Sequence, residues 1–248
     1  MILEIDGVCR EYGGVRALDS VSFGVEEGTI KGLIGPNGAG KTTLFNIISG
    51  FEKASRGKVL FEGLDISRME PQDIVKLGLV RTFQLTRVFG NLTVLENVMI
   101  SKKVPNSYRG IINEMREHDE ELAPRSLEFL ELVGLGEKRN SLARDLSYGQ
   151  QKLLDIARAL ATEPKVLLLD EPFAGVNPGI IRNIKEKITE IREEGHTILL
   201  IEHNLSAVME LCDSVVVLDY GKKLAEGKPG QVKRNPLVIE AYLGRGGR

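Results

Sequence analysis

The chain has 248 residues, of which 42% are hydrophobic and 27% charged, a composition that is typical of a folded globular protein and excludes a largely disordered one. Lys and Arg total 33 against 35 Asp and Glu, so no overall positive field favours nucleic acid or anionic lipid. The longest apolar runs have four residues, far below the roughly 18 that span a bilayer, and the first residues lack the pattern of a signal peptide. We therefore expect a cytoplasmic protein without nucleic-acid partners.

The N-terminal third predicts short strands separated by glycine turns. Residues Val21–Val25, Thr29–Ile34 and Lys58–Phe61 are β-patterned, and turn signals such as Glu26-Glu27-Gly28 lie between them. We expect antiparallel hairpins beside one strand and helix that bind a nucleotide.

From about residue 92 to residue 163 the pattern becomes helical. Pro124 suits the first turn of a helix, Leu127, Leu130 and Val133 form its apolar stripe, and Gly134 marks its end. This segment is expected to be a helical lobe inserted into the core.

After Pro164 strands and helices alternate. Nearly continuous apolar strands at Val166–Asp170 and Thr197–Ile201, with helices at 180–193 and 205–211, predict a parallel sheet buried on both faces. Residues 215–218 and 222–225 read as a closing hairpin. The fold class is therefore α/β, with a mostly parallel sheet, an N-terminal antiparallel β subdomain and an inserted helical subdomain. We expect one domain over 1–248, with 1–91 and 164–248 as its core and 92–163 as the helical part.

A glycine-rich segment follows the strand Ile30–Ile34 and precedes the helical run Thr43–Ile48. It matches the pattern Gly-x4-Gly-Lys-Ser/Thr, in which backbone N–H groups and a helix N-terminus hold phosphate. Lys41 is expected to reach the β- and γ-phosphates, and the Thr42 hydroxyl to ligate Mg²⁺. A plain glycine turn would not need this strand-loop-helix order. The expected nucleotide-binding residues are Gly35, Pro36, Asn37, Gly38, Ala39, Gly40, Lys41, Thr42 and Thr43.

Two carboxylates follow the buried strand that ends at residue 170. Asp170 is expected to hold Mg²⁺ through water, and Glu171 to orient or deprotonate the water that attacks the γ-phosphate. A buried strand must in any case end in something polar, but the phosphate loop elsewhere in the chain favours the functional interpretation.

The hexamer Leu146–Gln151 reads LSYGQQ and resembles the signature motif of ABC ATPases, which other phosphate-loop enzymes such as kinases and GTPases do not share. Ser147 and Gln150 also have the spacing of a helix capping box, and both interpretations are compatible. In the family, this motif meets the ATP held by the phosphate loop of a second, oppositely oriented subunit. The resemblance thus implies that Ser147, Gly149 and Gln150 contact ATP across a head-to-tail dimer.

Further elements of the family fall in order along the whole chain. Tyr12 resembles the aromatic residue that stacks on adenine, with an ordinary half-buried tyrosine as the alternative. Gln84 resembles the glutamine that senses Mg²⁺ and couples to the membrane subunit, and His203 the histidine that contacts the γ-phosphate. With Glu171 and Lys41, these two residues complete the implied catalytic set, and Gln84 joins Thr42 and Asp170 as a metal residue.

The sequence departs from the common family pattern at two places. Asn177 stands where many members have Asp, so it offers a hydrogen bond but no charge, and Tyr148 replaces the commoner Gly.

Four segments resemble the ATPases of branched-chain amino acid importers: Arg81–Gln84, Leu92–Val98, Glu171–Pro178 and the tail Asn235–Gly244. The lipopolysaccharide exporter ATPase has a similar tail and remains an alternative, as does a non-transport ABC ATPase. Outside the family, a small-molecule kinase and a nucleotide-dependent regulator without turnover are the rivals. The resemblance implies an ATPase that uses ATP and Mg²⁺ and lies on the inner face of the membrane. Its expected partners are a second ATPase subunit, identical or paralogous, integral membrane permeases and an extracytoplasmic substrate-binding protein.

Overall fold

The structure is a computed structural model that describes residues 1–84, 88–102 and 119–243. Part of the expected helical lobe, at 103–118, and the tail residue Gly244 lie outside the described residues. The chain forms two compact units. The first consists of Met1–Arg81, Lys165–Glu171 and Arg192–Arg248, and the second of Thr82–Pro164 and Pro172–Ile191.

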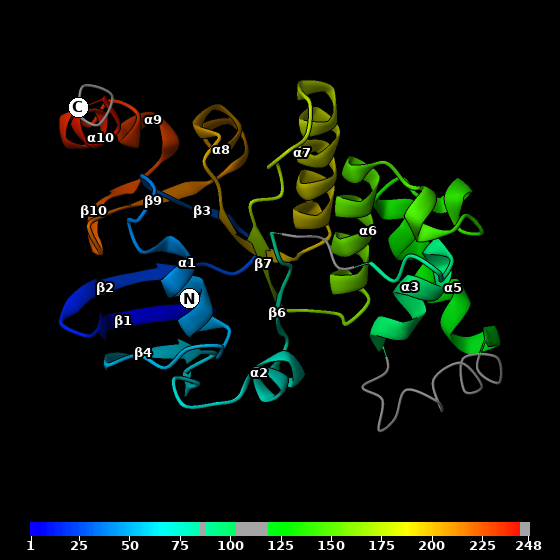
Figure 1. The fold of residues 1–248 in the computed structure, drawn as a ribbon, viewed down its shortest axis with the longest axis horizontal. Coiled ribbons are helices and arrows are strands. Elements are labelled where there is room, and N and C mark those ends of the chain that lie inside the picture. Colours follow the sequence, from blue (N-terminus) through cyan, green and yellow to red (C-terminus); the bar gives the residue numbers. More distant parts are fainter. Residues whose placement is uncertain (85–87, 103–118, 244–248) are drawn as a thin grey trace. The chain divides into compact units, whose positions relative to one another are not determined.

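The first unit contains a four-stranded antiparallel sheet in the order β2-β1-β4-β5, drawn in blue and cyan in Figure 1. Its strands are β1 (Leu3–Tyr12), β2 (Val15–Val25), β4 (Arg56–Phe61) and β5 (Leu64–Asp65). Buried and more exposed residues alternate along much of β1 and β2, as in strands with one face on the core. The structure confirms the antiparallel hairpins, and residues Leu3–Tyr12 form a further strand that the sequence pattern did not predict.

The same unit contains a six-stranded sheet in the order β10-β9-β3-β8-β7-β6. Its strands are β3 (Ile30–Ile34), β6 (Leu79–Arg81), β7 (Val166–Asp170), β8 (Thr197–Ile201), β9 (Ser214–Asp219) and β10 (Lys222–Gly227). All pairs are parallel except the closing hairpin β9-β10. Every residue of β3, β7 and β8 is buried, which confirms the parallel sheet that the apolar runs predicted.

Helix α1 (Lys41–Ile48) packs its apolar side chains into one core cluster with residues from both sheets. It buries Leu44, Phe45, Ile47 and Ile48, each of which contributes on the order of 1.5–3 kcal/mol when removed from water. This packing anchors the helix that begins at Lys41. The other helices of the unit are α2 (Pro71–Leu77), α8 (Leu205–Leu211), α9 (Pro229–Val232) and α10 (Pro236–Leu243).

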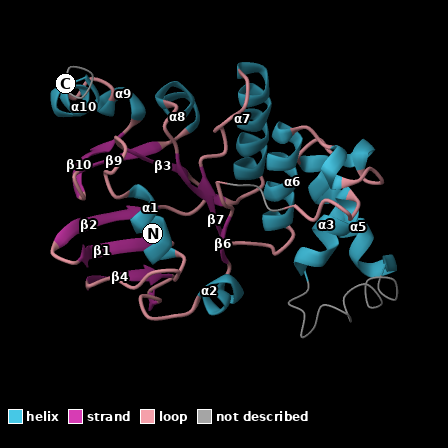
Figure 2. Ribbon diagram, in the orientation of Figure 1, coloured by secondary structure: helices cyan, strands magenta, loops and turns pink. Residues whose placement is uncertain are grey.

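The second unit is drawn in helices and loops in Figure 2. Its helices are α3 (Val94–Met99), α5 (Asp119–Leu132), α6 (Tyr148–Leu160) and most of α7 (Pro178–Glu193), with short 3₁₀ turns at Ile100–Lys102, Gly136–Lys138 and Ala143–Asp145. A capping box begins α3, because the Thr93 hydroxyl accepts from the Glu96 N–H and the Glu96 carboxylate from the Thr93 N–H.

The expectation that Pro124 opens a helix is wrong. Helix α5 already includes Asp119, so Pro124 lies inside it. A proline there removes one intrahelical hydrogen bond, and the apolar contacts of Phe129, Leu130 and Val133, which are buried, stabilise the helix nonetheless. Among the described residues, no helix is long and apolar enough to span a membrane.

Candidate active site

Three parallel neighbours of the large sheet, β3, β8 and β7, end at the same edge. The phosphate loop follows β3, Glu202 and His203 follow β8, and Glu171 follows β7. Residues that follow adjacent parallel strands meet at the carboxyl edge, which is where ligands bind in sheets of this type. The sheet order therefore assembles this site from three distant parts of the chain.

The phosphate loop depends on glycines that no larger residue could replace. Gly35 has φ 153°, and a Cβ there would lie 2.2 Å from the Leu218 carbonyl oxygen. Gly40, the N-cap of α1, has φ 99°, and its Cβ would lie 2.7 Å from the Ala17 oxygen. The loop therefore follows a backbone path that only glycine permits at these points, and it leads directly into the N-terminus of α1.

Lys41 is buried and folds back over the loop. Its ammonium donates to the backbone oxygens of Gly35 at 2.7 Å and Pro36 at 3.0 Å. These contacts hold the positive charge within the loop.

Glu171 has a left-handed backbone conformation, with φ 51°, which is costly for a residue with a side chain. Its N–H donates to the Ile201 oxygen at 3.0 Å, which holds the turn in place. One carboxylate oxygen lies 2.9 Å from His203 Nε2. An ionised carboxylate only accepts hydrogen bonds, so a hydrogen bond between these two atoms requires the imidazole tautomer with its proton on Nε2.

His203 itself is held by a buried carboxylate. One oxygen of Glu202, a residue only 3% exposed, accepts from the backbone N–H groups of His203 and Asn204. The Asn204 side chain in turn caps α8 by accepting from the Ala207 N–H. His203 therefore lies in a turn whose backbone is held by the side chains of Glu202 and Asn204.

Residues 37–43 of the phosphate loop line one cavity of about 290 Å³ together with Glu171 and His203, whereas Gly35 and Pro36 do not line it. Its lining residues are Ala17, Asn37, Gly38, Ala39, Gly40, Lys41, Thr42, Thr43, Glu171 and His203. Nine of these ten lining residues were predicted from the sequence, namely residues 37–43 of the loop, Glu171 and His203, and Ala17 was not.

Asp170 ends β7 and is only 7% exposed. Its Oδ2 accepts from the Arg81 guanidinium at 2.7 Å. The role of Arg81 was missed, because only the pairing of β6 with β7 brings these residues together. In the sequence, Arg81 was noted only within the segment Arg81–Gln84, and neither the strand Leu79–Arg81 nor the identity of its neighbour was predicted.

Tyr12 ends β1 and is 41% exposed. The Arg10 guanidinium lies 4.5 Å from the centroid of the Tyr12 ring and covers one face of it. The Tyr12 hydroxyl donates to Glu52. Any base that stacks on this ring without displacing Arg10 must use the opposite face.

The signature residues lie in the second unit. Ser147 caps α6, its hydroxyl accepting from the Gln150 N–H at 3.4 Å while the Gln150 side chain accepts from the Ser147 N–H at 3.1 Å. The capping box is thus confirmed. Gly149 is buried, and a Cβ there would lie 2.5 Å from Cγ2 of Ile180. The packing against Ile180 therefore requires a glycine at this position, independently of any contact with ATP.

Gln84 and Asn177 also belong to the second unit. Gln84 is exposed and lies in a bend. The Asn177 side chain accepts from the Ile180 N–H at 3.0 Å in the first turn of α7. An aspartate could accept the same bond, so the departure at Asn177 preserves this contact.

Within the described residues, no group of three or more His, Cys, Asp or Glu side chains is placed to hold a metal ion. Mg²⁺ in nucleotide sites needs less than this, since one or two protein oxygens act with phosphates and water. Thr42, which lines the cavity, and Asp170, which precedes Glu171 in the sequence, offer a hydroxyl and a carboxylate as oxygen ligands of this kind. The residues present therefore fit Mg²⁺.

A glycine-rich loop of the phosphate-binding pattern beside a carboxylate-histidine pair is typical of the phosphate-loop nucleotide hydrolases. The family model described as ABC transporter matches residues 18–174, and one described as branched-chain amino acid ATP-binding cassette transporter matches residues 222–248. The chain belongs to the ABC transporter family and is an ATPase that binds nucleotide.

Two similar proteins illustrate this membership. The chain is 40% identical to a probable branched-chain amino acid transport ATP-binding protein of Archaeoglobus fulgidus, over 98% of this chain and 95% of that protein. It is 39% identical to the high-affinity branched-chain amino acid transport ATP-binding protein of Escherichia coli K12, over 98% of each.

Solved structures agree. A nucleotide-free ATP-binding cassette from an ABC transporter has a TM-score of 0.86 at 38% identity and covers 98% of this chain and 99% of that one. The ADP conformation of such a cassette has a TM-score of 0.88 at 38% identity, covering 98% of each. A dimeric bacterial ABC transporter cassette has a TM-score of 0.74 at 28% identity, covering 92% of this chain and 98% of that one.

Proposed function

We propose that the chain is the ATP-hydrolysing subunit of an importer of branched-chain or related amino acids. The match of residues 222–248 to a branched-chain amino acid cassette model supports this substrate class over a lipopolysaccharide exporter. The names of the relatives from Archaeoglobus fulgidus and Escherichia coli support it too. In this proposal the subunit docks on integral permeases at the inner face of the membrane, and an extracytoplasmic binding protein delivers the substrate.

The observation that carries the hydrolytic function is the shared cavity of the phosphate loop, Glu171 and His203. Backbone N–H groups of the loop and the N-terminus of α1 bind the phosphates. Lys41, which donates to Gly35 and Pro36, exchanges these carbonyls for the β- and γ-phosphates. Thr42 and Asp170 would hold Mg²⁺, with Gln84 as the residue that senses it, and the metal would supply charge neutralisation for the transferred phosphoryl group.

In this proposal Glu171 acts on the attacking water, and His203 holds the Glu171 carboxylate in position. The carboxylate orients a water molecule toward the γ-phosphorus and accepts its proton as the new P–O bond forms and the bond to the ADP oxygen breaks. The hydrogen bond from Nε2 of His203 limits the rotation of the carboxylate. The same imidazole, which lines the cavity, contacts the γ-phosphate.

Two copies complete each site. Ser147, Gly149 and Gln150 of one copy bind the ATP held by the phosphate loop of another, and Tyr12 stacks on its adenine. The dimeric relative supports this arrangement. Hydrolysis weakens the contact and reopens the dimer, and the change reaches the permeases near Gln84.

The test is the Glu171→Gln variant. The amide retains the shape of the side chain but cannot accept a proton from water, so we expect phosphate release to fall by at least a hundredfold, within the range that general bases contribute. ATP binding should persist, and size-exclusion chromatography with light scattering should show a dimer that requires MgATP. Phosphate release at the wild-type rate would reject the role of Glu171, and a monomer at every ATP concentration would reject the composite site.

The substrate class needs a separate measurement. Proteoliposomes that contain the chain, its permeases and the binding protein should take up labelled leucine in the presence of internal ATP. Phosphate release without leucine uptake would leave the ATPase assignment intact and contradict the substrate.

A further inference from the structure

Arg81 joins the end of one strand to the carboxylate that ends the next. The register pairs Arg81 with Leu168, so its side chain extends along β7 to Asp170, two residues further on. One terminal nitrogen, Nη2, donates to Asp170 Oδ2 at 2.7 Å. The two side chains are 6% and 8% exposed, so solvent screens this ion pair only weakly.

The other terminal nitrogen of Arg81 binds α1, the helix that follows the phosphate loop. Nη1 donates to Asn46 Oδ1 at 2.8 Å and to Ser49 Oγ at 3.1 Å. The Ser49 hydroxyl donates its own proton to the Phe45 oxygen at 2.6 Å, so its oxygen acts as the acceptor for Arg81. The guanidinium also lies 5.5 Å from the centroid of the Phe45 ring. Arg81 therefore spans from the phosphate-loop helix to the acidic strand end.

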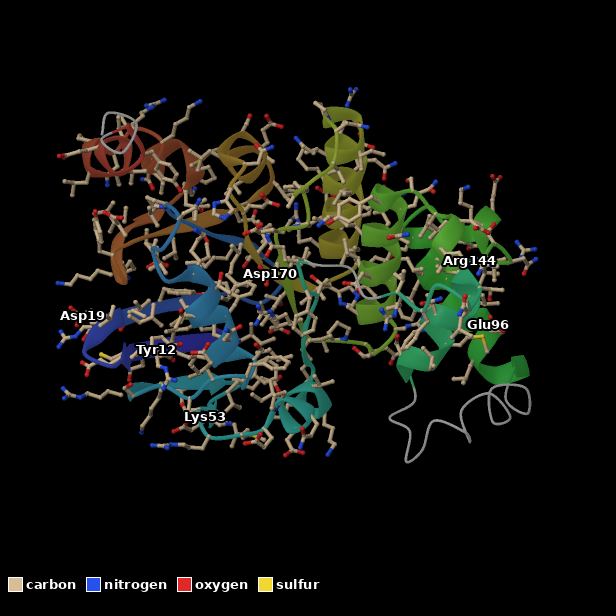
Figure 3. The ribbon with its side chains drawn as sticks, viewed as in Figure 1. Tyr12, Asp19, Lys53, Glu96, Arg144 and Asp170 are labelled. Atoms are coloured by element: carbon tan, nitrogen blue, oxygen red, sulfur yellow. The ribbon has the colours of Figure 1, made fainter. Side chains whose placement is uncertain are left out.

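A second carboxylate fixes the orientation of Asn46. Its Nδ2 donates to Glu52 Oε1 at 2.8 Å, which turns Oδ1 toward Arg81. Glu52 also accepts from the Tyr12 hydroxyl and lies 3.6 Å from Arg10 Nε. A continuous chain of hydrogen bonds thus runs from Tyr12 through Glu52, Asn46 and Arg81 to Asp170; Figure 3 labels its two ends.

A buried ion pair is weak evidence for stability, because removing two charges from water offsets their attraction. Its geometry is more informative here. A planar guanidinium with one nitrogen on α1 and the other on Asp170 restricts rotation of the carboxylate. A lysine, with a single ammonium on a flexible stem, cannot reproduce this fork.

We propose that Arg81 is a positioning residue for magnesium binding: it holds Asp170 in the orientation that serves the metal, and Asn46 holds Arg81. This inference rests on the proposed function, in which Asp170 binds Mg²⁺ through water. Arg81 itself does not touch the metal or the phosphates in this scheme.

The alternative is that the positive charge of Arg81 competes with the metal for Asp170, and it predicts the opposite effect on metal binding. If Arg81 only competed with the metal for Asp170, its removal would tighten metal binding. If Arg81 positions Asp170, its removal weakens metal binding even though a positive charge is lost. Arg81→Lys keeps the charge and removes the fork, whereas Arg81→Gln removes the charge as well, so the pair of variants separates the two effects.

The experiment measures Mn²⁺ binding by electron paramagnetic resonance in the presence of a non-hydrolysable ATP analogue, together with the Mg²⁺ concentration that half-saturates phosphate release. We expect both Arg81 variants to bind Mn²⁺ about tenfold more weakly, as for a lost hydrogen bond to a charged group. Nucleotide binding measured without metal should stay within about twofold of wild type.

Asn46→Ala tests the second step, because it removes the group that orients Arg81 and leaves Asp170 intact. We expect a loss of about threefold in Mn²⁺ affinity. The effect is smaller because Asn46→Ala removes only the hydrogen bond from Arg81 to Asn46 and leaves the ion pair between Arg81 and Asp170. In the double variant with Arg81→Lys, the effects should not multiply, because both act through the same contact. Arg125→Lys is the matched control: its guanidinium also bonds carboxylates but is 52% exposed, and Mn²⁺ binding should not change.

The outcomes separate this inference from the proposed function. Wild-type Mn²⁺ affinity in Arg81→Lys, or tighter binding in Arg81→Gln, would overturn the positioning role. A wild-type chain that binds no Mn²⁺ with the nucleotide would instead contradict the proposed function itself. Thermal unfolding checks that each variant folds, and should Arg81→Gln not fold, Arg81→Lys and Asn46→Ala decide the question.

Discussion

At the scale of single residues, the backbone of Glu171 is the feature that most sets the site apart from its surroundings. A left-handed conformation at a non-glycine residue costs roughly 1–2 kcal/mol. Glycine would avoid this cost but would lack the carboxylate that bonds His203. The position therefore sacrifices stability for the placement of one functional group, as strained residues at active sites commonly do.

Comparing Glu171→Gly with Glu171→Ala tests this account, because both variants lose the carboxylate and only alanine retains the strain. We expect the glycine variant to be more stable than the alanine variant by about 1 kcal/mol in urea unfolding. Both should lose phosphate release. Equal stability of the two, or a more stable alanine variant, would contradict the strain at φ 51°.

At the scale of elements, Gly149 shows that a signature residue also serves the packing of two helices. It lies in the first turn of α6, where a Cβ would come within 2.5 Å of Ile180 at the start of α7. Both helices have apolar faces, and the close approach of their N-terminal turns requires a residue without a side chain.

Gly149→Ala should accordingly destabilise the fold by about 1–3 kcal/mol, the cost of an overpacked contact. Ile180→Ala removes the Cγ2 that the new methyl would meet, so the double variant should lose less stability than the sum of the two single variants. The measurement is a double-mutant cycle in urea unfolding without nucleotide. Additive effects would mean that the methyl group is accommodated elsewhere, and the packing role of Gly149 would fail.

At the scale of the whole molecule, the bound nucleotide is expected to stabilise the folded chain. A ligand at one hundred times its dissociation constant adds about 2.7 kcal/mol. For a chain of this size, that corresponds to a rise in Tm of roughly 5–10 °C. MgATP should produce this shift in the Glu171→Gln variant, which does not consume the nucleotide.

Lys41→Ala provides the matched control, because it removes the ammonium from the phosphate loop and leaves Glu171 in place. The thermal shift with MgATP should largely disappear in differential scanning fluorimetry. A shift as large as that of the Glu171→Gln variant would show that Lys41 does not bind the phosphates, and would count against the assignment of the loop.

The sequence alone determined those features that neighbouring residues encode. The glycines and Lys41 of the loop, the apolar strand that ends at Asp170 and the capping box at Ser147 are all local patterns, since their backbone conformation and hydrogen bonds involve residues only a few positions apart. The parallel sheet followed from apolar strands that alternate with helices. Even so, the local pattern misplaced the start of the helix that contains Pro124, because tertiary packing stabilises it there.

Only the tertiary structure decided which strands are neighbours. Arg81 and Asp170 are 89 positions apart, and their contact exists because β6 pairs with β7. The cover of Arg10 on Tyr12, the link through Glu52 and the contact of Gly149 with Ile180 likewise depend on side chains brought together by packing. The physical reason is that an apolar pattern indicates a strand buried within a sheet but does not specify which strands lie next to it. Strand order therefore depends on interactions of the entire chain.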